Sequence, residues 1–178
     1  MLRALKKLLP AAPNPAASVT YIALVAQARH PFFYETLAVP DTLDGRFEMI
    51  VLHLFLLQYR LRLDAPEFAR GLSEIFIADM DRSLREIGVS DTGVSKRMKA
   101  MGRAYHGRLQ AYSLVTERVA LEAALARNLY GTVADGNVAH LKTMANYVEA
   151  MKTTLAEIPA PELTSGAYVW VSPETLAR

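Results

Sequence analysis

The sequence predicts an all-α protein: a single helical domain of about six helices around a central apolar helix, with a short irregular C-terminal tail. Residues 41–63 give the first indication, because His53 is the only residue that is not apolar between Met49 and Leu57. A helix that is apolar on nearly every face is typical of one surrounded by other helices. Elsewhere, apolar residues recur at helical spacing between prolines and glycines that end the segments.

Bulk composition excludes several classes of protein. A chain of 178 residues without cysteine can bury a core and has no disulfide or thiolate metal site. The four histidines lack the i,i+3 or i,i+4 spacing of helical metal ligands, so we expect no metal and no cofactor. A net charge of +2 argues against a DNA-binding protein. The sequence shows no signal peptide and no transmembrane stretch, which predicts a cytoplasmic location.

The chain is expected to have two parts. Residues 1–17 form a basic amphipathic N-terminal segment and a linker, and residues 18–178 form the helical domain. Leucines lie opposite basic residues in the first nine positions. This segment therefore either touches an anionic membrane surface or packs on the domain as a frayed helix.

The first helix of the domain is predicted over residues 19–29, with Ser18 as its cap. The dipeptide His30-Pro31 ends this helix, because a proline disfavours helical backbone in the residue before it. Three aromatic side chains follow at residues 32–34, and we expect this cluster to pack against the central helix.

The central helix is expected to begin at Asp41 or Thr42, whose side-chain oxygens can cap its first amides. Its apolar run is shorter than the roughly 20 residues needed to cross a bilayer. Arg46, His53 and Arg60 are seven residues apart and form a narrow basic seam along one side. Either the arginines extend toward solvent at the two ends and His53 is a satisfied core histidine, or the seam meets a neighbouring carboxylate or an anionic ligand.

A third helix is predicted from a cap at Asp64 to a left-handed stop at Gly88. Asp79 falls within its apolar stripe, and a carboxylate buried there needs a partner, for which the basic seam is the expected donor. Asp81 points outward, where Arg85 can reach it at i+4. The two aspartates face opposite ways on a helix and do not suggest a metal site. The candidate structural charge network comprises Arg46, His53, Arg60, Asp79, Asp81 and Arg85.

Residues 92–116 contain several basic residues and no acid, and a turn and cap at residues 90–93 precede them. Apolar residues that include two methionines run along the opposite side at helical spacing. The segment is either an ordinary amphipathic helix with a solvated basic face, or a surface suited to anionic lipid, ribosomal RNA or an apolar client segment. The candidate residues for client or membrane binding are Lys96, Arg97, Met98, Lys99, Met101, Arg103 and Tyr105.

Two more helices are predicted, one over residues 116–130 and one from a cap at Asp135 or Asn137 to residue 158. Glycine or proline follows each of them. The tail over residues 162–178 is too short for a sheet of its own and is expected to lie against the helices. No phosphate loop, dinucleotide-binding glycine pattern or Ser-His-Asp arrangement is present, so we do not expect an enzyme.

Several strings of residues together resemble the ubiquinol–cytochrome c chaperone family, the assembly factors of the cytochrome bc1 complex. Three segments carry the resemblance, at residues 39–57, 76–89 and 91–108, and residues 27–34 fit as well. The strings DGRF at residues 44–47 and DMDRSLRE at residues 79–86 are quite specific to the family. The resemblance spans roughly residues 18–130. The family pattern falls on Asp44, Gly45, Arg46, Phe47, Asp79, Met80, Asp81, Arg85, Glu86, Gly88, Lys96 and Arg97.

The resemblance implies an all-α chaperone of the bacterial branch that acts in the assembly of respiratory complex III and is not an enzyme. Mitochondrial members of the family bind newly made cytochrome b near the ribosomal exit at the inner membrane, together with a small partner protein. The expected partners are unassembled cytochrome b and an anionic membrane surface, with the ribosome and a small partner protein as further candidates. The expected location is cytoplasmic and peripherally associated with the inner membrane.

Two other functions fit the residues. One is a peripheral membrane or lipid-binding helical module, which would copurify with lipid, whereas a chaperone would copurify with cytochrome b. The other is an enzyme that uses Asp79 and His53 as an acid/base pair. Against the enzyme stands the absence of a glycine-rich loop or a nucleophile near these residues in the sequence.

Overall fold

A computed structural model describes residues 14–131 and 138–176, and helices form nearly all of the regular structure in these two stretches. Six helices of eleven or more residues lie in this part of the chain, which confirms the predicted all-α class. None of the helices in the described ranges is long and apolar enough to cross a membrane. The long helices are α2 (Pro15–Ala28), α4 (Leu43–Leu61), α5 (Pro66–Glu86), α6 (Asp91–Ser113), α7 (Arg118–Asn128) and α8 (Val138–Glu157). The short helices are α3 (Pro31–Glu35), α9 (Ala160–Leu163) and α10 (Pro173–Leu176).

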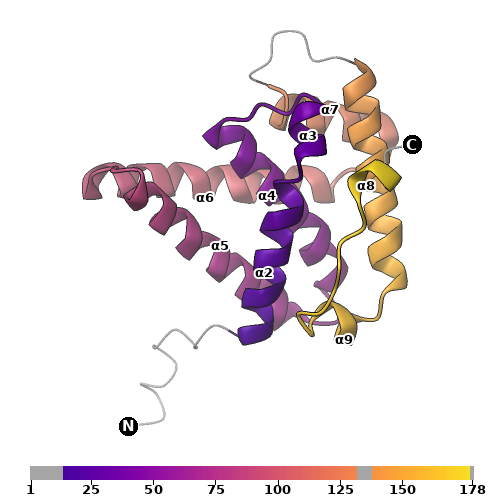
Figure 1. Ribbon diagram of the computed structural model, residues 1–178, viewed down its shortest axis with the longest axis horizontal. Helices are drawn as coiled ribbons and strands as arrows, with labels where there is room; N and C mark the ends of the chain where they lie inside the picture. The colour runs from indigo at the N-terminus through magenta and orange to yellow at the C-terminus, as the bar shows by residue number, and fades with distance from the viewer. Residues whose placement is uncertain (1–13, 132–137, 177–178) are drawn as a thin grey trace.

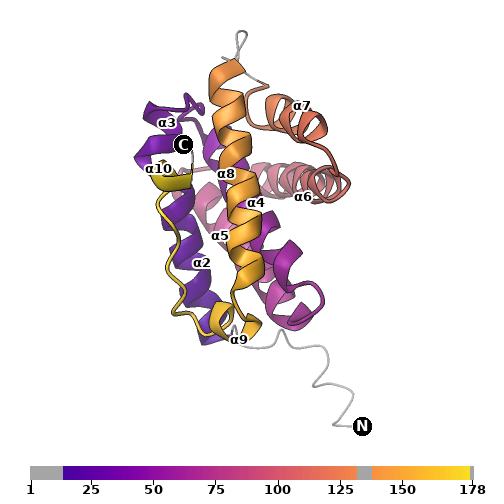
Figure 2. The same ribbon diagram turned by 90° about the vertical axis from the view of Figure 1, so that its right-hand side faces the viewer.

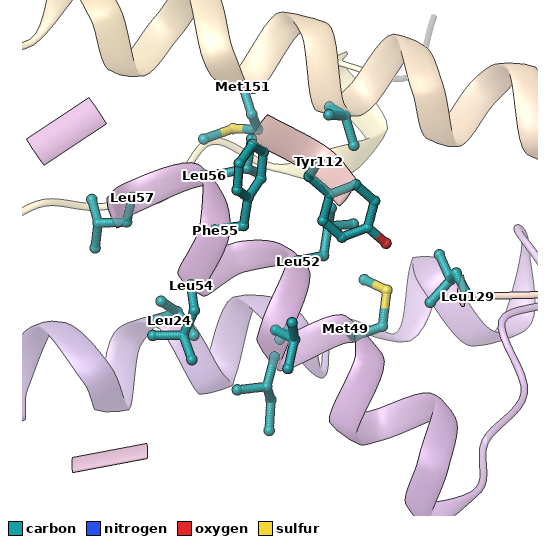
Figure 3. Close-up of a cluster of buried hydrophobic side chains, with 14 of the residues drawn as sticks. Leu24, Met49, Leu52, Leu54, Phe55, Leu56, Leu57, Tyr112, Leu129 and Met151 are labelled. Atoms are coloured by element: carbon teal, nitrogen blue, oxygen red, sulfur yellow. The ribbon is translucent and has the colours of Figure 1, made fainter. Parts of the chain in front are cut away.

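Helix α4 is the central element, as its sequence predicts, because α2, α5, α6 and α8 all pack against it (Figures 1 and 2). Its side chains leave the helix on several sides, as Figure 3 shows: Leu54 points toward Leu24 of α2, whereas Phe55 lies between α6 and α8. The rings of Phe55 and Tyr112 of α6 are 5.3 Å apart. Complete burial of one leucine stabilises a fold by about 1.5–3 kcal/mol. The run of buried apolar residues along α4 therefore supplies much of the driving force for folding.

Helix ends agree with the sequence at three positions. Thr42 caps α4 by accepting a hydrogen bond from the Gly45 amide at 3.1 Å, and Ser90 caps α6 in the same way. Gly88 follows α5 with a φ of 81°, in the left-handed region that favours glycine. The sequence therefore predicts both sides of the turn that joins α5 to α6.

Two predicted caps are wrong. Asn14, and not Ser18, caps α2, because its Oδ1 accepts from the Ala16 amide at 3.0 Å and the helix begins at the following proline. Asp64 does not cap α5, whose N-cap is Ala65 without a side-chain hydrogen bond. In both places the first helical position is a proline, which has no amide to satisfy and can start a helix itself. The predicted caps Asp135 and Asn137 and the basic N-terminal segment lie outside the described residues.

The C-terminal tail lies against the helices, as expected. It runs between α2 and α8 in Figure 1, and Figure 2 shows it lying along α2. Tyr168, Trp170 and Val171 pack against the core, and the Gln27 side-chain amide of α2 donates to the Val171 carbonyl at 3.0 Å. The tail therefore covers one side of the central helix.

Candidate functional site

His53 is a hydrogen-bonded core histidine, which is the first of the two alternatives for the basic seam. Its ring is completely buried, and its Nδ1 lies 2.8 Å from the Met49 carbonyl while its Nε2 lies 2.7 Å from the Tyr147 hydroxyl. A proton on Nδ1 satisfies the carbonyl and leaves Nε2 to accept from the tyrosine, so these partners assign the neutral tautomer. Burial lowers the pKa of His53 to about 4. The ring is a structural element without access to solvent.

The two arginines of the seam have separate partners. Arg46 is half exposed and donates to Asp41 at 2.6 Å. Arg60 binds Asp64, and it also donates to the carbonyls of Leu155 and Ile158, both at 2.9 Å. The last carbonyls of a helix lack intrahelical partners and attract positive charge. Arg60 thus stabilises the C-terminal end of α8.

The predicted pairing of Asp79 with this seam is wrong. Its carboxylate instead accepts from the Tyr21 hydroxyl of α2 at 2.9 Å and from Arg82 at 2.7 Å. The reason is that α2 packs on this part of α5, so a tyrosine of α2 reaches Asp79 before any side chain of α4. Neither bond involves His53, so the two residues of the hypothetical acid/base pair have separate partners. Among the described residues, no group of three or more histidines and acids could hold a metal ion.

Asp81 does contact Arg85, at 2.7 Å, as the i,i+4 spacing predicts, and Arg85 also reaches Asp91 at 2.6 Å. This contact links the end of α5 to the start of α6. The six residues of the candidate charge network therefore form five local groups and not one network.

A groove of about 990 Å³ runs between α2 and α5; we call it the α2–α5 groove. The two helices diverge from their N-terminal ends in Figure 1. Apolar residues from both helices line the groove, and Ile22 is 68% exposed there. The bonded group of Tyr21, Asp79 and Arg82 forms part of its wall. Sequence analysis missed this groove, because neither helix alone has an unusual pattern.

A second groove of about 790 Å³ lies where the start of α4, the middle of α6 and the end of α7 meet; we call it the α4–α6–α7 groove. Apolar side chains that include Phe47, Met101 and Leu129 line part of it. Arg97 of α6 and Arg127 of α7 also line it. Its lining includes parts of two strings that carry the family resemblance, at the start of α4 and on α6.

A buried ion pair forms part of the wall of the α4–α6–α7 groove. Arg108 of α6 donates to both carboxylate oxygens of Glu48 of α4, at 2.8 to 3.2 Å. Burial raises the pKa of Glu48, and the hydrogen bonds from Arg108 only partly offset that rise, while Glu48 raises the pKa of Arg108. Desolvation dominates the pKa of Glu48 but not that of Arg108, because the Glu48 side chain is 10% exposed and the Arg108 side chain is 28% exposed. The sequence offers one signal for this pair: an acid directly before the apolar run of α4.

The candidate client-binding residues of α6 fall on two different faces. Tyr105 is 3% exposed, and its hydroxyl bonds to Gln58 and Ser73 at 3.0 and 2.9 Å, so it belongs to the core. Met98 and Met101 are partly buried against the same core. The four cations are exposed, and none forms an ion pair within the part of the chain that the structure describes; they are Lys96, Arg97, Lys99 and Arg103.

The string DGRF at residues 44–47 has a structural explanation at the start of α4. Gly45 is buried against Pro40, and a Cβ at this position would lie 1.9 Å from the Pro40 carbonyl oxygen. Arg46 holds Asp41 just before the helix, and the Phe47 ring lies 5.8 Å from the Phe76 ring of α5. The string therefore fixes how the chain enters the central helix beside the α4–α6–α7 groove.

Replacing Gly45 by alanine is expected to destabilise the fold by about 1–3 kcal/mol, because the new methyl group overlaps backbone that cannot move freely. Gly102 in α6 is the matched control, since nothing lies within 4 Å of a Cβ built there. There the same substitution should stabilise the fold by about 0.5–1 kcal/mol, which is the helix preference of alanine over glycine. Urea unfolding of both variants measures the two effects, and equal changes would show that the contact with Pro40 relaxes.

Comparison with known proteins identifies the family. The model of the ubiquinol-cytochrome C chaperone family matches residues 35–170. Protein CBP3, mitochondrial, of Saccharomyces cerevisiae is 25% identical over 150 residues, which are 80% of this chain and 45% of the yeast protein, so the chain spans under half of that relative. The ubiquinol-cytochrome-c reductase complex assembly factor 1 of Xenopus laevis is 22% identical over 161 residues, 87% of this chain and 80% of that one.

A solved structure has the same fold over the whole length of the chain. It is the crystal structure of the Cbp3 homolog from Brucella abortus, which is 33% identical, covers 99% of both chains and superposes with a TM-score of 0.81. The family model and this structure together cover the helices that form both grooves. The chain therefore belongs to the ubiquinol–cytochrome c chaperone family.

Proposed function

We propose that this protein is an assembly chaperone of the cytochrome bc1 complex and that it binds newly made cytochrome b. The observation that carries the proposal is the family match over residues 35–170, together with a relative named as an assembly factor of ubiquinol-cytochrome-c reductase. Such a client exposes apolar helices before they find one another and is then prone to aggregation. A protein that covers one such helix for a time would protect it.

The α2–α5 groove supports this role better than the methionine side of α6 does. Its lining includes Ile22, Val25, Ile75 and Ala78, and Ile22 is largely exposed. Two diverging helices with apolar residues between them can take up a third helix, because an apolar helix in a groove is a common mode of recognition. Tyr105, Met98 and Met101 contribute to the core, which leaves less apolar surface on α6 for a client.

The exposed cations of α6 are proposed to contact the anionic surface of the inner membrane. Lys96, Lys99 and Arg103 have no acidic partner among the described residues, so their charge is free to attract lipid headgroups or ribosomal RNA. Attraction of this kind weakens as salt rises, since screening acts over about 8 Å at physiological ionic strength. Release of the protein from membranes by salt would fit this arrangement.

Deletion of the gene tests the function itself. Cells without the protein should synthesise cytochrome b yet lack assembled bc1 complex, so ubiquinol-dependent cytochrome c reduction in their membranes should fall to a small fraction of the parental rate. A pulse label for cytochrome b synthesis, a membrane haem spectrum and the reductase assay give the three measurements. Normal bc1 content in the deletion strain would overturn the assignment.

Photo-crosslinking in the complemented strain tests the client surface. A photoreactive residue at Ile22, 68% exposed in the α2–α5 groove, should crosslink to cytochrome b. Val119 of α7 is the matched control, because it is also a branched apolar residue and is 75% exposed outside both grooves. Crosslinks from both positions alike would contradict the groove as the client site. Crosslinks to lipid alone would favour the rival lipid-binding module.

A further inference from the structure

We propose that the α4–α6–α7 groove is a binding site for one anionic lipid molecule. Arg97, Arg127 and Asn128 would hold the phosphate group, and the first part of an acyl chain would lie on the apolar wall. The site uses different residues from the α2–α5 groove and does not depend on the identity of the client. Three features of the groove support the proposal.

The first feature is a pair of arginines without partners. Arg97 and Arg127 are exposed, both line the groove, and neither forms an ion pair with the described residues. Arg108 is also in the lining, but Glu48 already neutralises it. Asp44 is the remaining acid of the lining, so the two free arginines outnumber it. A guanidinium group matches the geometry of a phosphate, with which it can form two parallel hydrogen bonds.

The second feature is a buried amide that lacks a hydrogen-bond partner. Asn128 is 8% exposed, lines the groove, and its side-chain nitrogen has no partner within hydrogen-bond geometry. The amide interacts weakly with the Tyr112 hydroxyl, whose pKa it lowers against a larger rise caused by burial, in a geometry that falls short of a regular hydrogen bond. Leaving a buried donor unpaired costs about 1–3 kcal/mol. The nitrogen lies beneath the surface of the groove, so an anion there would satisfy it after a rotation of the amide.

The third feature is the apolar part of the lining. Phe47, Leu84, Met101 and Leu129 face a groove of about 790 Å³, and sites for small molecules are commonly 300–1,000 Å³ and mostly apolar with a few polar groups. A free phosphate ion would leave these side chains uncovered. The first residues of α4 also line the groove, and the N-terminal end of a helix favours a negative charge. An anionic amphiphile matches both parts of the lining.

Calorimetric titration of the full chain with dihexanoyl-phosphatidylglycerol, kept below its micelle concentration, tests the site. Dihexanoyl-phosphatidylcholine and inorganic phosphate are titrated in parallel. The Arg97→Gln/Arg127→Gln variant removes the two free charges, and Asn128→Leu replaces the buried amide by an apolar group with the same branching. The Arg62→Gln/Lys142→Gln variant is the charge-matched control, since both of its residues are exposed, neither lines a groove and neither belongs to the cations of α6.

We expect the phosphatidylglycerol to bind and the phosphatidylcholine not to bind. Affinity should fall about tenfold or more in the double arginine variant and in Asn128→Leu, and it should persist in the control. Asn128→Leu should melt no lower than the parent, because it replaces an unpaired polar group. If it fails to fold, the arginine variant decides the test.

Four results would overturn the proposal. They are equal binding of both lipids, equal affinity for inorganic phosphate and for the lipid, equal losses in the control variant, and no binding of phosphatidylglycerol. The second would identify a site for a free anion only. None of these results bears on whether the protein supports bc1 assembly, which the deletion strain tests separately.

Discussion

Replacing Arg108 by methionine is expected to lower the free energy of unfolding by about 3–5 kcal/mol at neutral pH. The substitution leaves the Glu48 carboxylate buried, 10% exposed, without the cation that donates three hydrogen bonds to it. Methionine fills the space of the arginine stem, so the loss reflects the unpaired charge and not a cavity. Urea unfolding at about pH 7.5 gives the measurement.

Two comparisons separate this cause from general damage to the groove. The double variant Glu48→Gln/Arg108→Met should recover much of the lost stability, because replacing both partners of a buried pair is far less costly than removing one. Burial already raises the pKa of Glu48, and loss of Arg108 raises it further. The deficit of Arg108→Met relative to the parent should therefore shrink as pH falls and the carboxyl group takes up a proton. A deficit that is the same in the double variant and at about pH 5 would contradict the prediction.

The central helix and several of its neighbours could be predicted from the sequence because local chemistry determines them. A run of apolar residues on every face of α4 requires burial on every side. The Thr42 side chain caps the first amides of α4, and Gly88 adopts the left-handed backbone that ends α5. The Asp81–Arg85 contact follows from spacing on one helix. Predictions that depend on a single element were confirmed in these cases.

The predicted partner of Asp79, which depends on which helices are neighbours at that point, is wrong. Asp79 was expected to bind a basic residue of α4, but Tyr21 of α2 is the side chain that reaches it. Tyr105 fits either a core or a client surface by pattern alone, and only the packing of α6 on α5 places it in the core. Both grooves form between helices that are distant in the sequence, so no local pattern marks them.

His53 is expected to make the protein less stable as pH falls from about 6.5 to about 4. In the unfolded chain the imidazole takes up a proton near its ordinary pKa of 6.5, whereas burial lowers the pKa in the folded state to about 4. Between these values the unfolded state binds more protons, so acid favours unfolding. The contribution is fully present above pH 6.5 and is lost progressively below it. A shift of this size corresponds to about 3 kcal/mol.

A glutamine in place of His53 isolates this contribution. Its amide can still meet the Tyr147 hydroxyl, which also accepts from Gln27 of α2, but it cannot titrate. The His53→Gln variant should be less stable than the parent at neutral pH, because the ring also packs against Phe33 and Trp170. Its stability should nevertheless fall much less between about pH 6.5 and about pH 4. An unchanged slope in His53→Gln would mean that burial does not lower the pKa of His53 in the folded protein, because only a pKa that differs between the folded and unfolded states couples this proton to unfolding.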